Sequence, residues 1–102
     1  MIFADFYDFC ISLEDVEETF PFDKNTLVFK KKSKIFALAN TLDFKFINLK
    51  CDPIEALELR GQFQGIRPGY HMNKKHWNSI HVNQDVPDKF IYKLIQKSYG
   101  LV

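Results

Sequence analysis

Eleven consecutive residues, 67–77, concentrate most of the chemistry that this sequence offers. They read R-P-G-Y-H-M-N-K-K-H-W and place three cationic side chains, two histidines, one asparagine and two large rings around a Pro-Gly corner. Cationic side chains contact phosphates, and amide and imidazole groups donate hydrogen bonds to phosphates or base edges. The pattern therefore predicts a nucleic-acid-binding loop.

A second basic group is expected at the tip of a hairpin that contains the segment K-K-K-S-K, residues 30–34. Two basic projections from one sheet could straddle a nucleic-acid backbone, provided that they share one face. The candidate contact residues in the two groups are Arg67, His71, Asn73, Lys74, Lys75, His76, Lys31, Lys32 and Lys34.

Two other interpretations of the central run stay open. In the first, the run is a rigid corner in which Tyr70 and Trp77 belong to the core, Asn73 forms a turn and the lysines are ordinary exposed residues. In the second, a small-ligand pocket lies beside His71 and Trp77. The sequence does not choose between these and the nucleic-acid interpretation.

The three histidines do not form a metal motif. His71, His76 and His81 are spaced five residues apart with no acidic residue or cysteine between them. That spacing puts consecutive members on different faces of a helix and on opposite faces of a strand. We expect no metal centre and no cofactor, and the absence of a nucleophile–base pattern or phosphate loop argues against an enzyme.

Composition is that of a soluble globular protein. Hydrophobic residues make up 46% of the 102 residues and charged residues 26%, while no apolar run is long enough to span a membrane. Cys10 and Cys51 are isolated thiols, and we expect both to be buried as small apolar side chains. These features predict a cytoplasmic protein that does not enter the membrane.

Charge is distributed unevenly along the chain, although the net charge is only +1. Residues 1–25 hold seven acidic residues and one lysine, whereas residues 26–102 hold thirteen basic residues and six acidic ones. An acidic end and a basic remainder can steer an anionic partner toward one face of a nearly neutral protein.

Hydrophobic periodicity predicts the elements that position these groups. Apolar residues recur every three or four positions over about the first twelve residues, which indicates a helix. Alternating β-branched and aromatic residues predict strands at 26–30, 35–39 and 44–50, and the short links between them predict hairpins. Residues 12–25 have no sustained period and are read as a connection.

The second half of the chain repeats both patterns. Asp52, followed by Pro53 and Glu55, marks the start of a helix over residues 53–63, whose inner face we assign to Ile54, Leu57 and Phe63. Residues 66–70 read as an edge strand or extended corner and residues 77–82 as a strand. A final helix opens at Pro87, and its expected inner face is Ile91, Leu94, Ile95 and Ser98.

This order predicts an α+β two-layer sandwich. Hairpin links require an antiparallel sheet, here of four or five strands, and three helices must cover one of its faces because a sheet this aromatic would otherwise expose a large apolar surface. The whole chain, residues 1–102, is expected to form one domain.

The central motif, R-P-G-Y-H-M-N-K-K-H-W-N-S-I, resembles the MmcQ/YjbR-like family. F-P-F-D and L-K-C-D-P precede it, and V-P-D and S-Y follow it, so that the resemblance extends over nearly the whole chain in the same order. The resemblance implies a CyaY/frataxin-like fold. It also implies a DNA-binding role, with DNA as the partner, because that is how the family is described.

The implied fold raises an alternative from another class. Frataxins bind iron weakly through acidic residues along their first helix, and the first segment of this chain is also acidic. Hard cations prefer oxygen ligands, so the resemblance also allows a metal-handling or protein-interaction domain. The residues that would form this surface are Asp8, Glu14, Asp15, Glu17 and Glu18.

Overall fold

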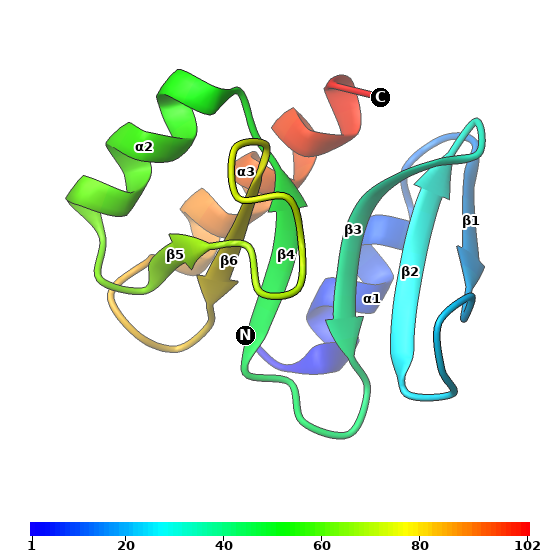
Figure 1. Ribbon diagram of the computed structural model, residues 1–102. Coiled ribbons are helices and arrows are strands. Elements are labelled where there is room, and N and C mark those ends of the chain that lie inside the picture. The colour runs from blue at the N-terminus through cyan, green and yellow to red at the C-terminus, as the bar shows by residue number, and fades with distance from the viewer.

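Three helices and six strands alternate along residues 1–102, all of which the computed structural model describes (Figure 1). In chain order they are α1 (Phe3–Ile11), β1 (Val16–Thr19), β2 (Thr26–Lys31), β3 (Lys34–Asn40), β4 (Phe46–Lys50), α2 (Pro53–Gln62), β5 (Ile66–Pro68), β6 (Trp77–His81) and α3 (Asp88–Gly100). The strands form one antiparallel sheet in the order β1-β2-β3-β4-β6-β5. The predicted α+β class and antiparallel sheet are confirmed.

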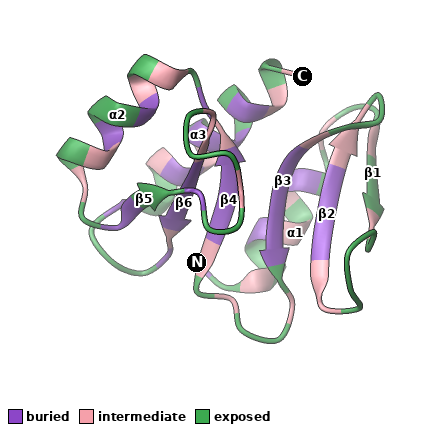
Figure 2. Cartoon of the chain, in the orientation of Figure 1, coloured by how far each residue is buried: buried purple, intermediate pink, exposed green.

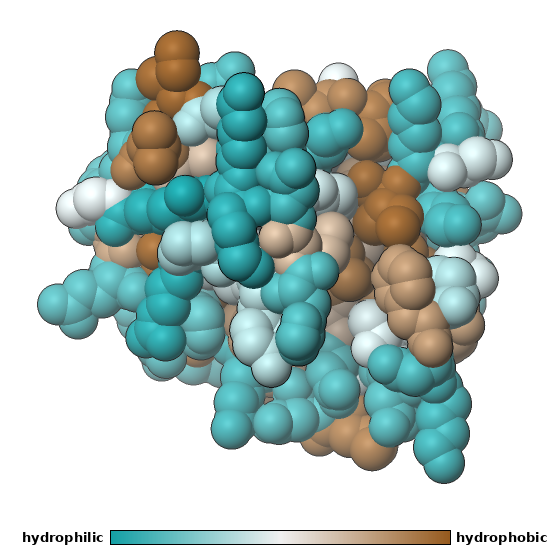
Figure 3. Space-filling view, viewed as in Figure 1, coloured by the Kyte–Doolittle hydropathy of each residue, from teal (hydrophilic) through white to brown (hydrophobic).

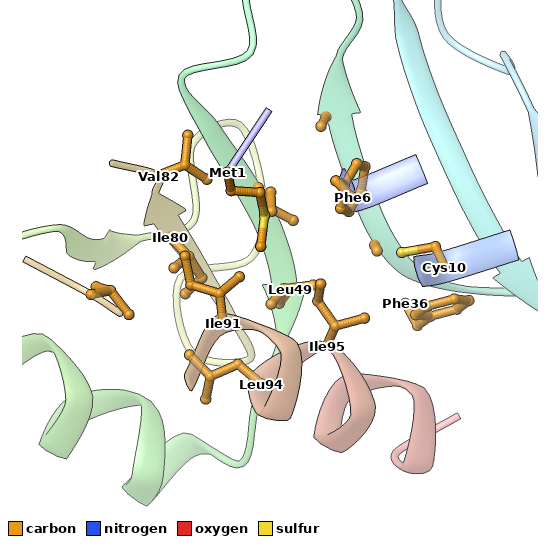
Figure 4. Close-up of a cluster of buried hydrophobic side chains, with 14 of the residues drawn as sticks. Met1, Phe6, Cys10, Phe36, Leu49, Ile80, Val82, Ile91, Leu94 and Ile95 are labelled. Atoms are coloured by element: carbon orange, nitrogen blue, oxygen red, sulfur yellow. The ribbon is translucent and has the colours of Figure 1, made fainter. Parts of the chain in front are cut away.

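The hydrophobic core lies between the helices and one face of the sheet (Figures 2 and 4). Alternate strand residues, such as Leu27 and Phe29 in β2 and Ile47 and Leu49 in β4, point into it. All three helices contribute to it, with Phe6, Cys10, Ala56, Leu59, Ile91, Leu94 and Ile95. We call the other face of the sheet, which no helix covers, the open face.

The sheet has six strands where the sequence predicted four or five. Residues 16–19 were read as part of a connection, but their backbone pairs with β2, with Val16 opposite Lys31 and Thr19 opposite Val28. This strand carries two glutamates and no buried residue. A short charged strand is a usual way of protecting a sheet edge, and it leaves almost no hydrophobic signal.

The predicted inner face of α2 is wrong for Ile54 and Leu57, whereas Phe63 at its end packs against the core as predicted. Ile54 and Leu57 are 71% and 66% exposed, whereas Ala56 and Leu59 are buried against the sheet. Both pairs are spaced three residues apart, so helical periodicity fits either face. The small side chain of Ala56 allows the close approach to the sheet that the bulkier pair would prevent.

Both cysteines are buried and unpaired, as predicted. Removal from water raises the pKa of the Cys10 thiol and raises the pKa of the Cys51 thiol to about 11. Both therefore remain protonated at neutral pH and behave as core side chains. None of the three helices is long and apolar enough to cross a membrane.

The sheet is divided into two three-stranded halves at the seam between β3 and β4. Although β3 has seven residues, only Ala37 and Leu38 pair with β4, opposite Leu49 and Asn48. Beyond Leu49 the two strands diverge toward the β2–β3 hairpin (Figure 1). The halves β1-β2-β3 and β4-β6-β5 are therefore joined by a short ladder only.

A buried serine of α3 bridges the diverging strands. The Ser98 hydroxyl accepts a hydrogen bond from Lys50 N in β4 at 2.9 Å and donates one to Phe36 O in β3 at 2.5 Å. Ser98 is fully buried and shares its helix face with Ile91, Leu94 and Ile95, as predicted. Its hydroxyl thus satisfies a donor and an acceptor that the strands no longer satisfy for each other.

Replacing Ser98 with alanine should lower the free energy of unfolding by about 2 kcal/mol, because a buried N–H and a buried C=O lose their partner. Chemical denaturation followed by circular dichroism measures this change. In a domain of this size it corresponds to a fall in melting temperature on the order of 10 °C.

Ser12→Ala is the matched control, since Ser12 also donates to a backbone carbonyl, Phe9 O, but is exposed. It should change the stability by no more than about 0.5 kcal/mol. Equal effects of the two substitutions would show that the bridge across the seam is not a special stabilising contact.

Candidate functional site

Residues 69–76, which we call the corner loop, begin on the open face above β4 (Figure 1). Asn48 and Ser79, which lie opposite each other on β4 and β6, are buried and hold the backbone of Tyr70. Tyr70 N donates to Ser79 Oγ at 2.9 Å, Asn48 Nδ2 donates to Tyr70 O at 3.1 Å, and Ser79 Oγ donates to Asn48 Oδ1. Both the backbone N–H and the backbone C=O of Tyr70 are therefore fixed to the sheet.

The corner loop is also closed by bonds within itself. Gly69 N donates to Trp77 O at 2.9 Å, and Trp77 N donates to Asn73 O at 3.0 Å. The Asn73 side chain accepts hydrogen bonds from the backbone N–H groups of Lys75 and His76. Asn73 thus forms the turn, one of the two roles that the sequence allowed, and its carboxamide oxygen is engaged.

Arg60 of α2 clamps the end of the corner loop against the sheet. Its Nε donates to Asn78 Oδ1 at 2.7 Å, and its Nη2 donates to the backbone oxygens of Lys74 and Trp77. One guanidinium therefore joins α2, β6 and the loop, which the planar array of five donors makes possible.

The rigid-corner interpretation is confirmed for the backbone but is wrong for the two rings. Tyr70 is 59% exposed, with its ring against Phe46 and His71 on the open face. Trp77 is half-buried and outside the core, because it alternates with Asn78 and Ile80, which face the helices. The position of Trp77 in the strand, and not the size of its ring, determines that its side chain lies on the face away from the core.

The cations of the corner loop and of the adjoining strand β5 are of two kinds. Lys74 Nζ donates to Gly69 O and helps to close the loop. Lys75 is exposed and its ammonium has no acidic partner, and the exposed Arg67 uses only its Nε, which donates to Gln64 O at 3.3 Å. His71 is exposed, with φ 57°, while His76 is half-buried and its O accepts from Cys51 N. Lys75 and Arg67 are the free cations here.

The hairpin lysines are divided in the same way. Lys31 Nζ lies 4.1 Å from the centroid of the Tyr99 ring in α3 and donates to Tyr99 O at 3.3 Å. Lys34 is directly opposite Lys31 and shares its face. Lys32 occupies the two-residue turn with Ser33, both with positive φ as expected for a tight hairpin. Lys32 and Lys34 are exposed.

The two basic groups share one end of the sheet and not one face. From the pairs Ala37–Leu49 and Leu49–Asn78, the β3 end that carries Lys34 lies at the same end as Lys75. Lys31 and its cross-strand partner Lys34, however, lie on the face turned toward the helices, where Tyr99 holds Lys31. The expectation that all five lysines share a face is wrong. What the two basic groups share is one end of the sheet.

The acidic residues of the first segment do not converge. Glu18 accepts a hydrogen bond from the Tyr7 hydroxyl at 2.8 Å, and this bond raises the pKa of Tyr7. Glu17 lies opposite Lys30 across β1 and β2. The structure brings together no group of three or more His, Cys, Asp or Glu side chains that could hold a metal ion.

A pocket of about 330 Å³ opens on the open face, across the seam between the two halves of the sheet. The pair Leu38–Asn48 lies at its floor, with Phe22 and Asp23 from the β1–β2 connection and Tyr70, His71 and Met72 from the corner loop around it. In the space-filling view, apolar side chains gather over this part of the face and hydrophilic ones surround them (Figure 3). His71 lines the pocket and Trp77 does not.

The chain is thus a small α+β protein with an antiparallel sheet and a corner loop fixed on the open face. A family model described as YjbR matches residues 11–101, and the chain belongs to this family. The uncharacterised protein YbdF of Escherichia coli O157:H7 is 41% identical over 93 residues, which cover 90% of this chain and 76% of that protein. The uncharacterised protein YjbR of Escherichia coli K12 is 28% identical over 97% of this chain and 85% of its own.

Solved structures show the same architecture. A crystal structure of a Deinococcus radiodurans protein matches with a TM-score of 0.91 and 41% identity, covering 97% of this chain and 76% of that one. A crystal structure of a Pseudomonas syringae protein matches with a TM-score of 0.83 and 30% identity, covering 99% and 98%. The divided sheet is thus built on an architecture that relatives share.

Sequence reasoning missed the polar residues that hold the corner loop. Asn48 lies in a largely apolar strand, Ser79 lies in a strand of mixed character, and Arg60 lies in a helix that also carries two glutamates. The only available signal was strand alternation, which puts a polar residue on the face away from the core at positions 48 and 79. That signal shows which face a side chain occupies but not which segment packs above it.

Gly69→Ala should destabilise the corner loop, because the added Cβ would lie 2.7 Å from Trp77 Cβ and 3.0 Å from Met72 Cβ. Since the neighbours are the first atoms of their side chains, the backbone must move, and we expect a loss of about 1–3 kcal/mol in the free energy of unfolding. Denaturant titration measures it, and faster amide hydrogen exchange should be confined to residues 69–77.

Gly61→Ala is the matched control within α2, where no atom lies within 4 Å of the added Cβ. This substitution should leave the stability unchanged or raise it by up to about 1 kcal/mol, because alanine favours the helix. If Gly69→Ala were equally harmless, the close approach of the loop to Trp77 would be disproved.

Proposed function

We propose that the protein binds DNA through phosphate contacts, with little sequence preference, and that two basic arms at one end of the sheet make these contacts. The hairpin arm is formed by Lys32 and Lys34, and the loop arm by Lys75 and Arg67, with His71 beside it. Electrostatic contacts of this kind supply essentially all of the affinity in non-specific binding. A cytoplasmic location belongs to the same proposal.

The observation that carries this proposal is the shared end of the two arms. The β2–β3 hairpin and the β5–β6 pair are three strand spacings apart in the sheet, which corresponds to at least about 14 Å and to more at this end, because β3 and β4 diverge beyond Leu49. The major groove of B-form DNA is about 12 Å wide. Arms with this spacing can reach the phosphates on both sides of one groove, and the divergence at the seam keeps them separate.

The charges of the remaining residues support the same orientation. Lys32, Lys34, Lys75 and Arg67 are exposed and form no salt bridge, so they meet DNA phosphates without first losing an acidic partner. The acidic residues of α1 and β1 lie at the opposite edge of the sheet from β5. A phosphate backbone is therefore attracted most strongly to the loop arm, because the hairpin arm lies beside the acidic strand β1.

The proposal includes a relationship of the fold to CyaY and frataxin. A first helix, an antiparallel sheet and a last helix on the same face as the first support it, together with the resemblance of the central motif. Superposition on a frataxin crystal structure tests it, and the relationship fails if the strand order β1-β2-β3-β4-β6-β5 has no equivalent there.

Removing one cation from each arm, in the double variant Lys34→Ala and Lys75→Ala, should weaken duplex binding at low salt. The slope of log K against log salt concentration should become shallower by about 0.9 for each phosphate contact that is lost. Fluorescence anisotropy with a short duplex of arbitrary sequence, titrated at several salt concentrations, measures both quantities.

The charge-matched control is Lys89→Ala with Lys93→Ala, two exposed lysines of α3 on the opposite side of the molecule from the open face. It should leave the slope unchanged. Equal slopes in the two double variants would remove the arms from the binding surface, and no binding of wild-type protein to any duplex or single strand at low salt would end the proposal.

A further inference from the structure

We propose that the pocket on the open face binds one unpaired nucleobase, so that the protein retains single-stranded DNA by one inserted base while the loop arm holds the adjacent phosphates. This inference rests on the proposed DNA binding and adds a preferred substrate, the unpaired strand. Its evidence is separate from that for the arms, because none of the arm residues lines the pocket apart from His71.

The size and walls of the pocket suit a single flat ring. A volume of about 330 Å³ lies at the lower end of the range for small-ligand sites. Phe22, Phe46 and Tyr70 supply aromatic surface, and Leu38 supplies an apolar floor. Phe22 is 64% exposed and lines the pocket, so its ring is accessible to a ligand. A base stacked on that ring would bury it.

Polar groups at the pocket keep unused hydrogen-bonding capacity. The Asp23 carboxylate accepts from Asn25 N, Thr26 N and Thr26 Oγ1, which occupies three of its about four acceptor positions. The Asn40 Oδ1 accepts from two backbone N–H groups, so its Nδ2 keeps both hydrogens. The pocket therefore offers a free acceptor and free donors, the two kinds of partner that a base edge needs.

The charge of the pocket distinguishes a base from an anion. Hydrogen bonds from Asn25 and Thr26 lower the pKa of Asp23, so this carboxylate stays ionised at neutral pH. No lysine or arginine lines the pocket. A phosphate or carboxylate would be repelled there, whereas an exocyclic amino group of adenine, cytosine or guanine can donate to Asp23.

The corner loop connects the pocket to the loop arm. Tyr70, His71 and Met72 form one wall of the pocket, and Lys75 follows three residues later on the same rigid loop. A strand whose base enters the pocket can follow the loop and place one of its next phosphates at Lys75. In an intact duplex the bases are paired and stacked, so filling the pocket would first require a base to leave the stack.

Phe22→Ala tests the pocket, with Phe20→Ala as the matched control. Both rings are exposed in the β1–β2 connection, at 64% and 47%, but only Phe22 lines the pocket. We expect Phe22→Ala to weaken binding of a single-stranded oligonucleotide by about tenfold, the effect of losing one stacked base. Duplex affinity should be unchanged in both variants, and melting temperatures should confirm that both fold.

A single-stranded oligonucleotide that contains 2-aminopurine supplies a direct signal. Wild-type protein and Phe20→Ala should quench its fluorescence through stacking, and Phe22→Ala should not. Equal single-strand affinities for the two variants, or no quenching by wild-type protein, would overturn the pocket while salt-dependent duplex binding could still stand. Absence of binding to duplex and single strand alike would overturn both proposals.

Binding of a free nucleoside distinguishes two possible ligands of the pocket, a base within a DNA strand and a soluble molecule that contains the same ring. Deoxyadenosine should bind at least tenfold more weakly than the oligonucleotide, because it makes no phosphate contacts at the loop arm. Equal affinity of the nucleoside and the oligonucleotide would show that the pocket serves a soluble heteroaromatic molecule and would contradict the strand proposal.

Discussion

The divergence of β3 and β4, bridged by one hydroxyl, is the constraint on which the rest of the structure depends. Between the strands, only two paired positions and the Ser98 bridge join the two halves, which also share one hydrophobic core. A continuous ladder would satisfy Lys50 N and Phe36 O directly and would bring the hairpin against β4. The buried serine lets the strands separate without leaving buried backbone groups unpaired, and this separation gives the hairpin and the corner loop independent positions at one end of the sheet.

The open face carries the consequences of this division. On one side of the seam, the β1–β2 connection leaves Phe22 exposed, and on the other the corner loop is fixed by Asn48, Ser79 and Arg60. The pocket lies between these two segments, which rise on either side of the sheet residues Leu38 and Asn48. Since the loop's own bonds engage Asn73 and Lys74, Lys75 is the free cation of the loop, and the rigid backbone reduces the entropy lost when a ligand binds there.

The sequence predicted the structure best where a residue pattern was compatible with only one arrangement of an element. Period-two runs and a Pro-initiated helix gave the order of elements, and the inner face with Ser98 followed from helical spacing. It failed where two solutions fitted equally, as with Ile54 and Leu57 in α2, or where packing left no signal, as with the charged edge strand β1. The sequence predicted which cations belong to the site but not which groups they contact. The contact between Lys31 and Tyr99, for example, joins residues 68 positions apart, and no local pattern indicates it.

The central claim is that DNA meets the two basic arms at the end of the sheet where the halves diverge. Amide chemical-shift mapping of isotopically labelled protein, titrated with a short duplex at low salt, tests it most directly. We predict that the largest shifts fall in residues 31–35 and 67–77, with little change in α1 and β1. Shifts centred on the acidic residues of α1 and β1, or no shifts at saturating duplex, would contradict it.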